Sequence, residues 1–304
     1  FDSYLYHVTK GDDNFEYQLQ EITGYAFSSF TFLRKFALFL GPKGTGKSTV
    51  LQIIGEMVDS SDLCAIPISK MEQEYYAADL LSSKLNIVAD LPKDILKDIS
   101  VFNSYVSDSD SKTGRNPCEE PETKRCRIKM LFGSNHHMQF NGPSKEDIDA
   151  YFDRAIYIPF NNFIDNRTHG YGDLLKSEAD YIFTWAMKGM KRLMDNGFEF
   201  TTCLSSERLK EEAMAQCCPQ ESFFKLCMKT VDDERYESSS AITEAFKNFC
   251  SQNRIKGSFN IIAYLDEQNI RKTRKRINED GYVISEGNPI YVYEGIRIRN
   301  KYRV

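Results

Sequence analysis

Apolar and polar residues alternate in blocks that predict an α/β protein. Residues 36–40 (FALFL) are continuously apolar, as buried strands are, and an apolar helix pattern follows through Val50, Leu51, Ile53 and Ile54. Three further short apolar runs predict strands at 85–90 (LNIVAD), 127–132 (RIKMLF) and 152–160 (FDRAIYIPF). We therefore expect buried strands that alternate with helices.

The helical segments have apolar residues every third or fourth position. This spacing predicts helices over residues 14–30, 70–84, 94–106 and 173–195. The last helix is interpreted as ending at Asn196-Gly197. It carries an apolar stripe that we assign to core packing rather than to a cofactor, formed by Leu174, Leu175, Tyr181, Ile182, Trp185, Met190 and Leu193.

A change in composition separates the last part of the chain. Residues 201–240 look helical but less ordered, with an acidic stretch and a serine run. Residues 241–304 then read as a compact unit, in which helices over 241–250 and 258–268 precede the strand-like runs RKTRKRI and PIYVYEGIRIR. That order predicts a winged helix-turn-helix.

The clearest chemical motif follows the first strand. Gly41, Gly46, Lys47 and Ser48 fill the pattern G-x-x-x-x-G-K-S between a strand and a helix. Glycines let backbone N–H groups wrap an anion, and a helix N-terminus favours negative charge. Lysine would reach the β- and γ-phosphates of ATP and serine would hold Mg²⁺. The cofactor-binding residues predicted from this loop are Gly41, Pro42, Lys43, Gly44, Thr45, Gly46, Lys47, Ser48 and Thr49.

Two polar residues follow later strands. Asp90 ends the run LNIVAD, and such an acid can hold Mg²⁺ through water and polarise an attacking water. The alternative is an acid that only caps the turn before Leu91. Asn135 follows the strand at 127–132 and can sense a γ-phosphate, or it can be an ordinary turn residue.

The segment 107–125 (SDSDSKTGRNPCEEPETKR) is almost wholly polar. Its glycine and prolines indicate either a surface loop or a hairpin that reaches a partner.

Composition limits the remaining possibilities. The chain has 304 residues, of which 41% are hydrophobic, and its net charge is −5, so any contact with nucleic acid must be local. No apolar run is long enough to span a membrane, and no signal peptide is visible. Because the first residue is Phe1, we expect the sequence to be a fragment of a longer protein.

The eight cysteines favour reduced thiols in a cytoplasmic protein. The alternative is a zinc site formed by Cys118, Cys126 and His136 or His137, whose spacing fits no common pattern.

The C-terminal unit is locally basic. This concentration of cations indicates a contact with nucleic acid, while the alternative is a solvated strand face. The residues are Arg271, Lys272, Arg274, Lys275, Arg276, Arg297, Arg299, Lys301 and Arg303.

Taken together, these motifs resemble the helicase part of phage and plasmid primase-helicases, the poxvirus-type branch of superfamily 3 within AAA+. The resemblance covers nearly the whole chain. The motifs that follow the family's order are LQEITGYAF, GPKGTGKST, KLNIVADLP, VFNSYVSDSD, IKMLFGSN, YFDRAIYIPF and IFTWAMKGMKRLMDNGF, then EAFKNFC and VYEGIRIR. Only the phosphate loop is specific by itself.

The resemblance implies a P-loop AAA+ core, a parallel sheet with flanking helices, followed by a winged-helix domain. It divides the chain into an N-terminal helical segment (1–30), the helicase core (31–200), a helical linker (201–240) and a DNA-binding domain (241–304).

It also implies roles for single residues. Lys47 and Ser48 match Walker A, Asp90 matches the Walker B acid, Asn135 matches sensor 1, and Arg154 matches an arginine finger that acts on a neighbouring subunit's nucleotide. Ser48 and Asp90 are thereby expected at Mg²⁺. The expected DNA contacts are Lys112, as the hairpin lysine, with Arg115, Arg271, Lys272, Arg274 and Lys275.

Two positions depart from the family pattern. Ala89 precedes Asp90 where many relatives have a second acid, so either Asp90 works alone or a neighbour such as Asp94 helps it. Residues 106–110 (VSDSD) stand where relatives usually have T-G-G-D, so the hairpin contacts are expected to differ.

The expected function is ATP-dependent DNA unwinding, with 3′-to-5′ translocation on single-stranded DNA, in the replication of a phage or mobile element. Expected partners are single-stranded and fork DNA, further copies of the chain in a ring, hexameric by resemblance, and a primase-polymerase domain in cis or trans. The setting would be the cytoplasm of a bacterial host. Two rivals remain: an AAA+ ATPase that loads or remodels another protein, and an origin-binding protein that uses nucleotide only as an assembly switch.

Overall fold

The computed structural model describes residues 1–92, 95–96, 99–107, 110–115, 120–140, 144–164, 175–232, 234–253, 255 and 259–299. It divides the chain into two compact units, Phe1–Lys210 and Glu211–Val304. Each unit has a hydrophobic core of its own.

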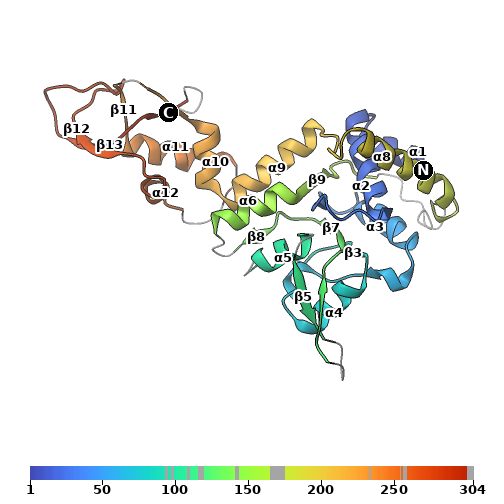
Figure 1. Cartoon of the computed structure of the whole chain (residues 1–304). Coiled ribbons are helices and arrows are strands. Elements are labelled where there is room, and N and C mark those ends of the chain that lie inside the picture. The colour runs from blue at the N-terminus through green and yellow to red at the C-terminus, as the bar shows by residue number, and fades with distance from the viewer. Residues whose placement is uncertain are drawn as a thin grey trace. The chain divides into compact units, whose positions relative to one another are not determined.

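A five-stranded parallel sheet lies at the centre of the first unit (Figure 1). Its strands are paired in the order β2-β3-β7-β1-β9. Because all the strands are parallel, their carboxyl ends meet at one edge of the sheet, where α/β proteins bind ligands. The strands, in that order, are Leu63–Cys64, Leu85–Val88, Lys129–Ser134, Phe36–Leu40 and Ala155–Pro159.

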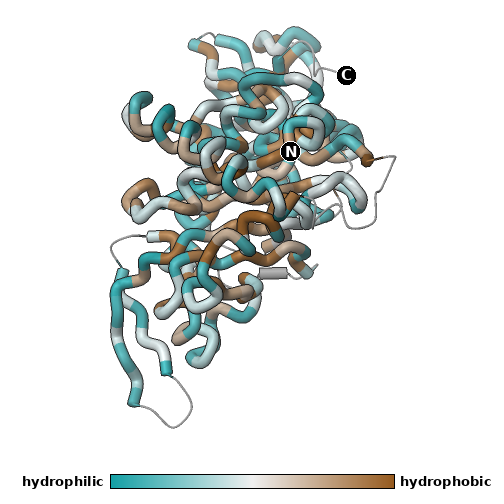
Figure 2. The backbone as a smooth tube through the Cα atoms, turned by 90° about the vertical axis from the view of Figure 1, so that its right-hand side faces the viewer, coloured by the Kyte–Doolittle hydropathy of each residue, from teal (hydrophilic) through white to brown (hydrophobic). Residues whose placement is uncertain are grey.

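Helices cover both faces of this sheet, so its strands are buried and apolar rather than alternating in polarity. On one face, the Phe36 ring lies 4.9 Å from the ring of Phe102 on α5 and 5.1 Å from that of Tyr151 on α6, centroid to centroid. On the other face, Ala37 and Phe39 belong to a core shared with α1, α2, α3 and α8. Figure 2 accordingly has its most hydrophobic stretch of tube within the first unit.

The helices and short elements of the first unit are as follows. The α-helices are α1 (Asp2–Thr9), α2 (Asp13–Phe27), α3 (Lys47–Glu56), α4 (Glu74–Ser82), α5 (Ile99–Val106), α6 (Lys145–Arg154), α8 (Ala179–Asp195) and α9 (Leu204–Cys217), the last of which continues into the second unit. The short elements are the 3₁₀ turns Ser60–Asp62 and Ile68–Lys70 and the paired strands β4 (Ile95–Leu96) and β8 (Gln139–Phe140).

The stripe predicted on the 173–195 helix is confirmed in most of its positions. Leu175, Ile182, Trp185, Met190 and Leu193 are buried. Tyr181 is instead exposed on the surface of α8, where its hydroxyl donates to Asp2. Leu174 lies outside the described residues.

Several predicted elements have different bounds: for example, the helix expected over 70–84 is Glu74–Ser82 and the one expected over 173–195 is Ala179–Asp195. The helix expected over 94–106 begins only at Ile99, since Ile95 and Leu96 pair with β8. The strand expected over 152–160 begins at Ala155, because α6 extends to Arg154. The side chain of Ser144 caps α6 by accepting from the N–H of Asp147.

The polar segment 107–125 contains a hairpin, which was one of the two alternatives. β5 (Ser111–Gly114) pairs antiparallel with β6 (Glu122–Arg125). Gly114 allows β5 to lie against α4, since a Cβ there would be 2.6 Å from the backbone N of Ala78. The two strands are mainly hydrophilic in Figure 2, so their outer surface is available to a polar partner.

Among its described residues, the second unit combines the end of α9 and the helices α10, α11 and α12 with two small antiparallel sheets. The sheets pair β10 with β14, and order β11-β13-β12. Phe223, Phe246, Leu265 and Tyr293 lie in its core. Its elements are α10 (Pro219–Cys227), β10 (Met228–Thr230), β11 (Tyr236–Ser238), α11 (Ser239–Gln252), α12 (Ile261–Glu267), β12 (Lys272–Lys275), β13 (Ile290–Glu294) and β14 (Ile296–Ile298).

Part of the segment predicted as a linker, 201–240, belongs to this second core. Phe223 on α10 is fully buried, with its ring 5.3 Å from that of Phe246. The run PIYVYEGIRIR forms two strands rather than one, because Gly295 turns the backbone with a φ of 76°.

Candidate nucleotide-binding site

The glycine-rich loop joins the carboxyl end of β1 to the first turn of α3. Gly46 is the N-cap residue of α3 and has a φ of 95°, which a side chain would strain. The Thr45 hydroxyl donates to the Pro42 carbonyl at 3.0 Å inside the loop. Lys43 and Ser48 are exposed at the mouth of the loop, and Thr49 is half-buried. The loop is thus folded over the positive end of the α3 dipole.

Lys47 is the first residue of α3 and is almost fully buried. Its Nζ donates to the carbonyl oxygens of Gly41 and Pro42, both at 2.7 Å, and to Asn135 Oδ1 at 3.1 Å. Burial lowers the pKa of Lys47, while the negative charge of Asp90 acts in the opposite direction. The ammonium is therefore held at the loop by three oxygen acceptors in a partly desolvated position.

Asp90 and Asn135 come together because β3 and β7 are adjacent and in register. Val88 at the end of β3 pairs with Phe132, two residues before the end of β7. Asn135 Nδ2 then donates to Asp90 Oδ1 at 2.9 Å. Asn135 therefore contacts Lys47 through its oxygen and Asp90 through its nitrogen. Asp90 itself is exposed, so water can reach its carboxylate.

Close backbone approach holds the ends of β3 and β7 in this arrangement. The N–H of Leu91 donates to the carbonyl of Gly133 at 2.7 Å. A Cβ at Gly133 would be 2.3 Å from the carbonyl oxygen of Ala89, so no larger residue fits between the strands. Glycine at this position therefore allows the turn that aims Asp90 at Asn135.

Residues outside the sequence motif also support the loop. The hydroxyl of Tyr4, on α1, donates to the Gly46 carbonyl at 2.9 Å, and the N–H of Ile164 donates to the Gly44 carbonyl at 3.1 Å. His7 Nε2 and the Phe163 carbonyl lie 2.6 Å apart, joining α1 to the same segment. The N-terminal helical segment expected over 1–30 includes α1, but the periodicity argument began only at residue 14 and the contact of Tyr4 with the loop was not predicted.

Arg154 lies at the opposite edge of the sheet. It is the last residue of α6, and β9 starts at Ala155, which pairs with Phe36 at the beginning of β1. The five residues of β9 span roughly 16 Å, so Arg154 is about that far from the loop of its own chain. Its Nη1 donates to the Ala150 carbonyl at 2.7 Å, and its buried Nε has no hydrogen-bond partner among the described residues.

Lys112 lies on β5 opposite Lys124. Its Nζ lies 5.2 Å from the centroid of the Tyr105 ring on α5, a cation–π contact that holds the half-exposed side chain. Arg115, at the end of β5, is exposed, and its N–H donates to the Glu74 carbonyl on α4. The hairpin is thereby joined to α4 and α5.

The basic residues of the C-terminal unit do not form one free patch. Arg297 is buried, with Nε 3.2 Å from Glu237 Oε2, so its positive charge is neutralised by an ion pair inside the unit. Arg271 pairs with Glu294 at 3.3 Å and Lys272 with Asp266 at 3.2 Å. Lys301 and Arg303 lie outside the described residues. Arg274 and Arg276 are exposed, and they donate to the carbonyl oxygens of Pro289 and Ser285.

The zinc alternative gains no support from the described residues. They contain no group of three or more His, Cys, Asp or Glu side chains placed to hold a metal ion. Cys126 is a free, buried thiol whose pKa is raised to about 11 by desolvation. Cys118 lies outside the described residues.

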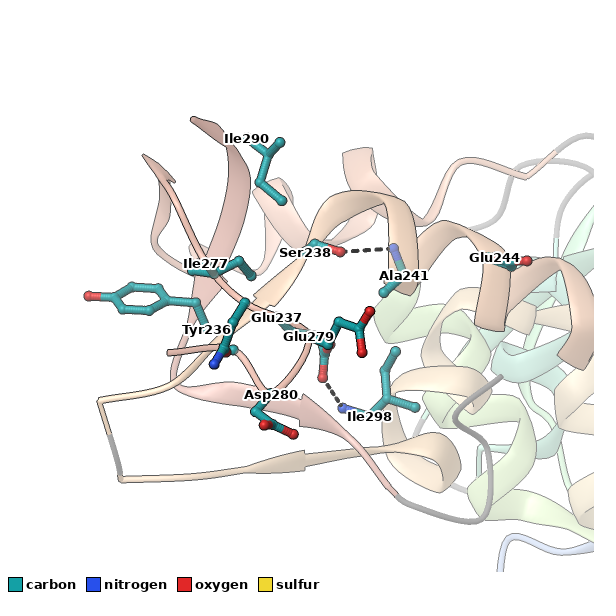
Figure 3. Close-up of a pocket in the computed structure, with 12 residues that line it drawn as sticks. Tyr236, Glu237, Ser238, Ala241, Glu244, Ile277, Glu279, Asp280, Ile290 and Ile298 are labelled. Atoms are coloured by element: carbon teal, nitrogen blue, oxygen red, sulfur yellow. Dashed lines mark hydrogen bonds between the residues drawn. The ribbon is translucent and has the colours of Figure 1, made fainter. Parts of the chain in front are cut away.

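A pocket of about 550 Å³ lies in the second unit and contains none of the predicted site residues. Figure 3 shows the carboxylate of Glu279 near the Glu237–Ile298 hydrogen bond, with Asp280 beside them. Since Glu244 also lines it, the pocket is acidic and unsuited to a phosphate.

Comparisons with known proteins bear on the fold. A family of unknown function, DUF5906, matches residues 39–154, which include the glycine-rich loop, Asp90 and Asn135. Comparison with curated protein sequences found no match. Within the described part of the chain, no helix is long and apolar enough to cross a membrane.

Two similar solved structures are apo forms of the C-terminal region of NrS-1. The A form has a TM-score of 0.54 and 10% sequence identity, over 96% of this chain and 74% of that one. A second apo structure has a TM-score of 0.53 with the same identity and coverage. At this identity the similarity concerns the mixed α/β fold.

Proposed function

We propose that this chain is an ATP-driven motor that moves on single-stranded DNA and unwinds DNA during replication. The observation that carries the proposal is the chain of contacts Lys47–Asn135–Asp90 at the carboxyl edge of the sheet. A cation for phosphates, an amide and an exposed acid converge there beside a helix N-terminus. These are the groups that phosphoryl transfer from ATP requires.

The residues fit ATP with Mg²⁺. The Pro42–Gly46 backbone and Lys47 would hold the phosphates, and Ser48 with Asp90 would hold the ion, directly or through water. When bound, Mg²⁺ neutralises charge that develops on the phosphates. Asp90 is the described acid at this edge and would orient the attacking water, with Asn135 fixing its carboxylate. Asp94, the other candidate base, lies outside the described residues.

The strand order supports an AAA+ assignment for the first unit. β7, with Asn135 at its end, lies between the strand that leads to the loop and the strand that leads to Asp90. An amide on this middle strand contacts both neighbours, so it is placed to report the state of the nucleotide to each of them.

A ring of several copies is supported by the position of Arg154. It lies too far from its own loop to reach a nucleotide there, and its buried Nε lacks a described partner. In a ring, the same side chain would approach the nucleotide of the adjacent copy and stabilise charge in the transition state.

DNA contacts are assigned to the β5–β6 hairpin and to the second unit. The hairpin lies in sequence between Asp90 and Asn135, so movement at the nucleotide would be passed to Lys112 and Arg115. In the second unit, helices α11 and α12 followed by the β12–β13 ribbon support a winged helix. By the family resemblance, the setting would be the replication of a phage or mobile element, with a primase-polymerase domain in cis or trans.

A forked DNA with a fluorescent strand tests the proposal. We expect ATP-dependent strand displacement from substrates with a 3′ single-stranded tail and none from substrates with only a 5′ tail. Displacement only from 5′ tails would reverse the proposed direction. Absence of displacement on every substrate, with ATP hydrolysed normally, would favour a remodelling ATPase.

The second candidate function is an assembly switch at an origin. The single acid at Ala89-Asp90 favours it, since one carboxylate must otherwise serve both Mg²⁺ and water. A switch would assemble on ATP or a non-hydrolysable analogue alike and would turn over no faster with DNA. Sedimentation with each nucleotide, combined with a turnover assay, separates the two functions.

A further inference from the structure

We infer that the exposed face of the β12–β13 ribbon formed by Lys272, Arg274 and Tyr291 binds single-stranded DNA by stacking a base on Tyr291. This inference rests on the proposed function and names the DNA form and the contact used by the second unit.

The ribbon places an exposed aromatic ring among cations. Tyr291 on β13 is directly opposite Arg274 on β12. The Arg274 Cζ lies 5.3 Å from the centroid of the Tyr291 ring, and Lys272 Nζ lies 5.4 Å from it. In spite of these contacts, 54% of Tyr291 is exposed. Sites that bind single-stranded DNA combine aromatic side chains, which stack on bases, with cations that contact the phosphate backbone. An exposed tyrosine ring beside two cations has this composition.

The position of the ribbon leaves this face accessible. β12 is the edge strand of its sheet, since the order is β11-β13-β12. Along β13, Ile290 and Tyr291 are exposed, while Val292 and Tyr293 are buried against the core. The rigid half of the strand therefore anchors the half that carries Tyr291.

Charge in the second unit favours a single strand over a duplex. Arg297 is buried, and Arg271 and Lys272 are paired with Glu294 and Asp266. Asp266 also accepts from the Tyr293 hydroxyl at 2.8 Å, so an acid is fixed beside the ribbon. Attraction of phosphates alone is therefore weakened. A contact with the face of a base, which only unpaired DNA offers, can supply the missing affinity.

The acidic pocket limits where the strand can lie. Glu244, Glu279 and Asp280 line the pocket together with Ile290, which pairs with Lys275 of β12 and so lies on the opposite face of the ribbon from Tyr291 (Figure 3). Their charges would repel a phosphate backbone. The DNA is thus directed to the other face of the ribbon, which carries Lys272, Arg274 and Tyr291.

The test compares binding of the full chain, without nucleotide, to oligothymidylate and to an abasic strand of the same length, about 15 nucleotides. We expect wild-type protein to bind the strand with bases roughly 5- to 150-fold more tightly. Tyr291→Ala should lose most of this preference and Tyr291→Phe should retain it. Tyr181→Ala is the matched control, since Tyr181 is similarly exposed (48%) on α8 of the first unit.

The inference would be overturned if Tyr291→Ala still preferred the strand with bases over the abasic strand, or if Tyr181→Ala lost that preference to the same extent. It would also be overturned if Tyr291→Ala lost binding to both strands equally. Photocrosslinking to a bromodeoxyuridine strand uses wild-type protein only, so its result does not depend on whether a variant folds. The crosslink should map to Tyr291, and a map without it would contradict the inference. Since these measurements use no ATP, they can fail while hydrolysis is intact, and succeed in a protein that does not hydrolyse ATP.

Discussion

The side chain of Asn135 donates from Nδ2 to Asp90 Oδ1 at 2.9 Å, while its oxygen accepts from Lys47 at 3.1 Å. One amide therefore fixes both the cation proposed to hold phosphates and the acid proposed to orient water. The arrangement depends on the orientation of the amide, because only a group that is a donor on one side and an acceptor on the other satisfies both neighbours.

Asn135→Asp tests this arrangement, because it removes only the donor that Asn135 offers to Asp90. The carboxylate keeps an acceptor for Lys47 but places a negative oxygen against Asp90, so Asp90 loses its donor. We expect kcat for ATP hydrolysis to fall by about 100-fold or more, as is typical when a group that orients catalytic residues is lost. Steady-state phosphate release measures this. A kcat within a few-fold of wild type would show that Asn135 is only a turn residue.

Arg154→Ala tests action on a neighbouring subunit. Because the side chain lies at the far edge of the sheet from its own loop, the variant should bind fluorescent nucleotide normally and lose about 10³-fold in turnover. Mixing variant and wild-type chains should lower activity by more than the wild-type fraction predicts. Activity that scales linearly with that fraction would assign Arg154 to its own chain.

Lys112→Ala tests the hairpin. The variant should lose DNA-stimulated hydrolysis and strand displacement, and the salt slope of single-strand binding should fall by roughly 0.7 for the lost phosphate contact. Lys124→Ala is the matched control, since Lys124 is opposite Lys112 and paired with Glu122. Equal unwinding by wild type and Lys112→Ala would reduce the hairpin to a surface feature.

Lys129 should make stability depend on pH. It is buried at the start of β7, where desolvation lowers its pKa to about 8. An unfolded chain has an ordinary lysine pKa of about 10.4, so between these values the unfolded state binds more protons and stability rises with pH. Below about pH 8 both states are protonated and the slope disappears.

The measurement is urea denaturation at about pH 7.5 and about pH 9.5. Relative to Lys129→Met, wild-type protein should gain about 2 kcal/mol over this interval. Lys191→Met, at an exposed lysine of α8, should keep the wild-type slope. Identical slopes in wild type and Lys129→Met would contradict the assigned pKa.

Sequence patterns predict the sheet well where apolar runs end in polar residues. The apolar runs at 36–40, 85–90 and 127–132 were enough to predict β1, β3 and β7 and to select Lys47, Asp90 and Asn135 as site residues, whereas the two-residue strand β2 was not predicted. Their convergence required one more fact, that β3, β7 and β1 are neighbours in that order. Pairing order arises from long-range packing, which local periodicity does not contain.

The incorrect sequence predictions also arise from long-range packing. Arg297 is part of an alternating basic run, and nothing local indicates that Glu237, sixty residues earlier, buries it in an ion pair. Arg154 was expected just before a strand within FDRAIYIPF, while the helix α6 that ends at Arg154, and its capping residue Ser144, were overlooked. Tyr4 was missed because its partner is a backbone carbonyl of the loop.

Phosphate release with and without single-stranded DNA tests whether the Lys47–Asn135–Asp90 site hydrolyses ATP to move DNA. Wild-type protein and Asp90→Asn would be compared after confirming that both bind nucleotide. We predict that single-stranded DNA accelerates wild-type hydrolysis and that Asp90→Asn binds ATP without turnover. Hydrolysis by Asp90→Asn at the wild-type rate, or a wild-type rate unchanged by DNA, would contradict this prediction.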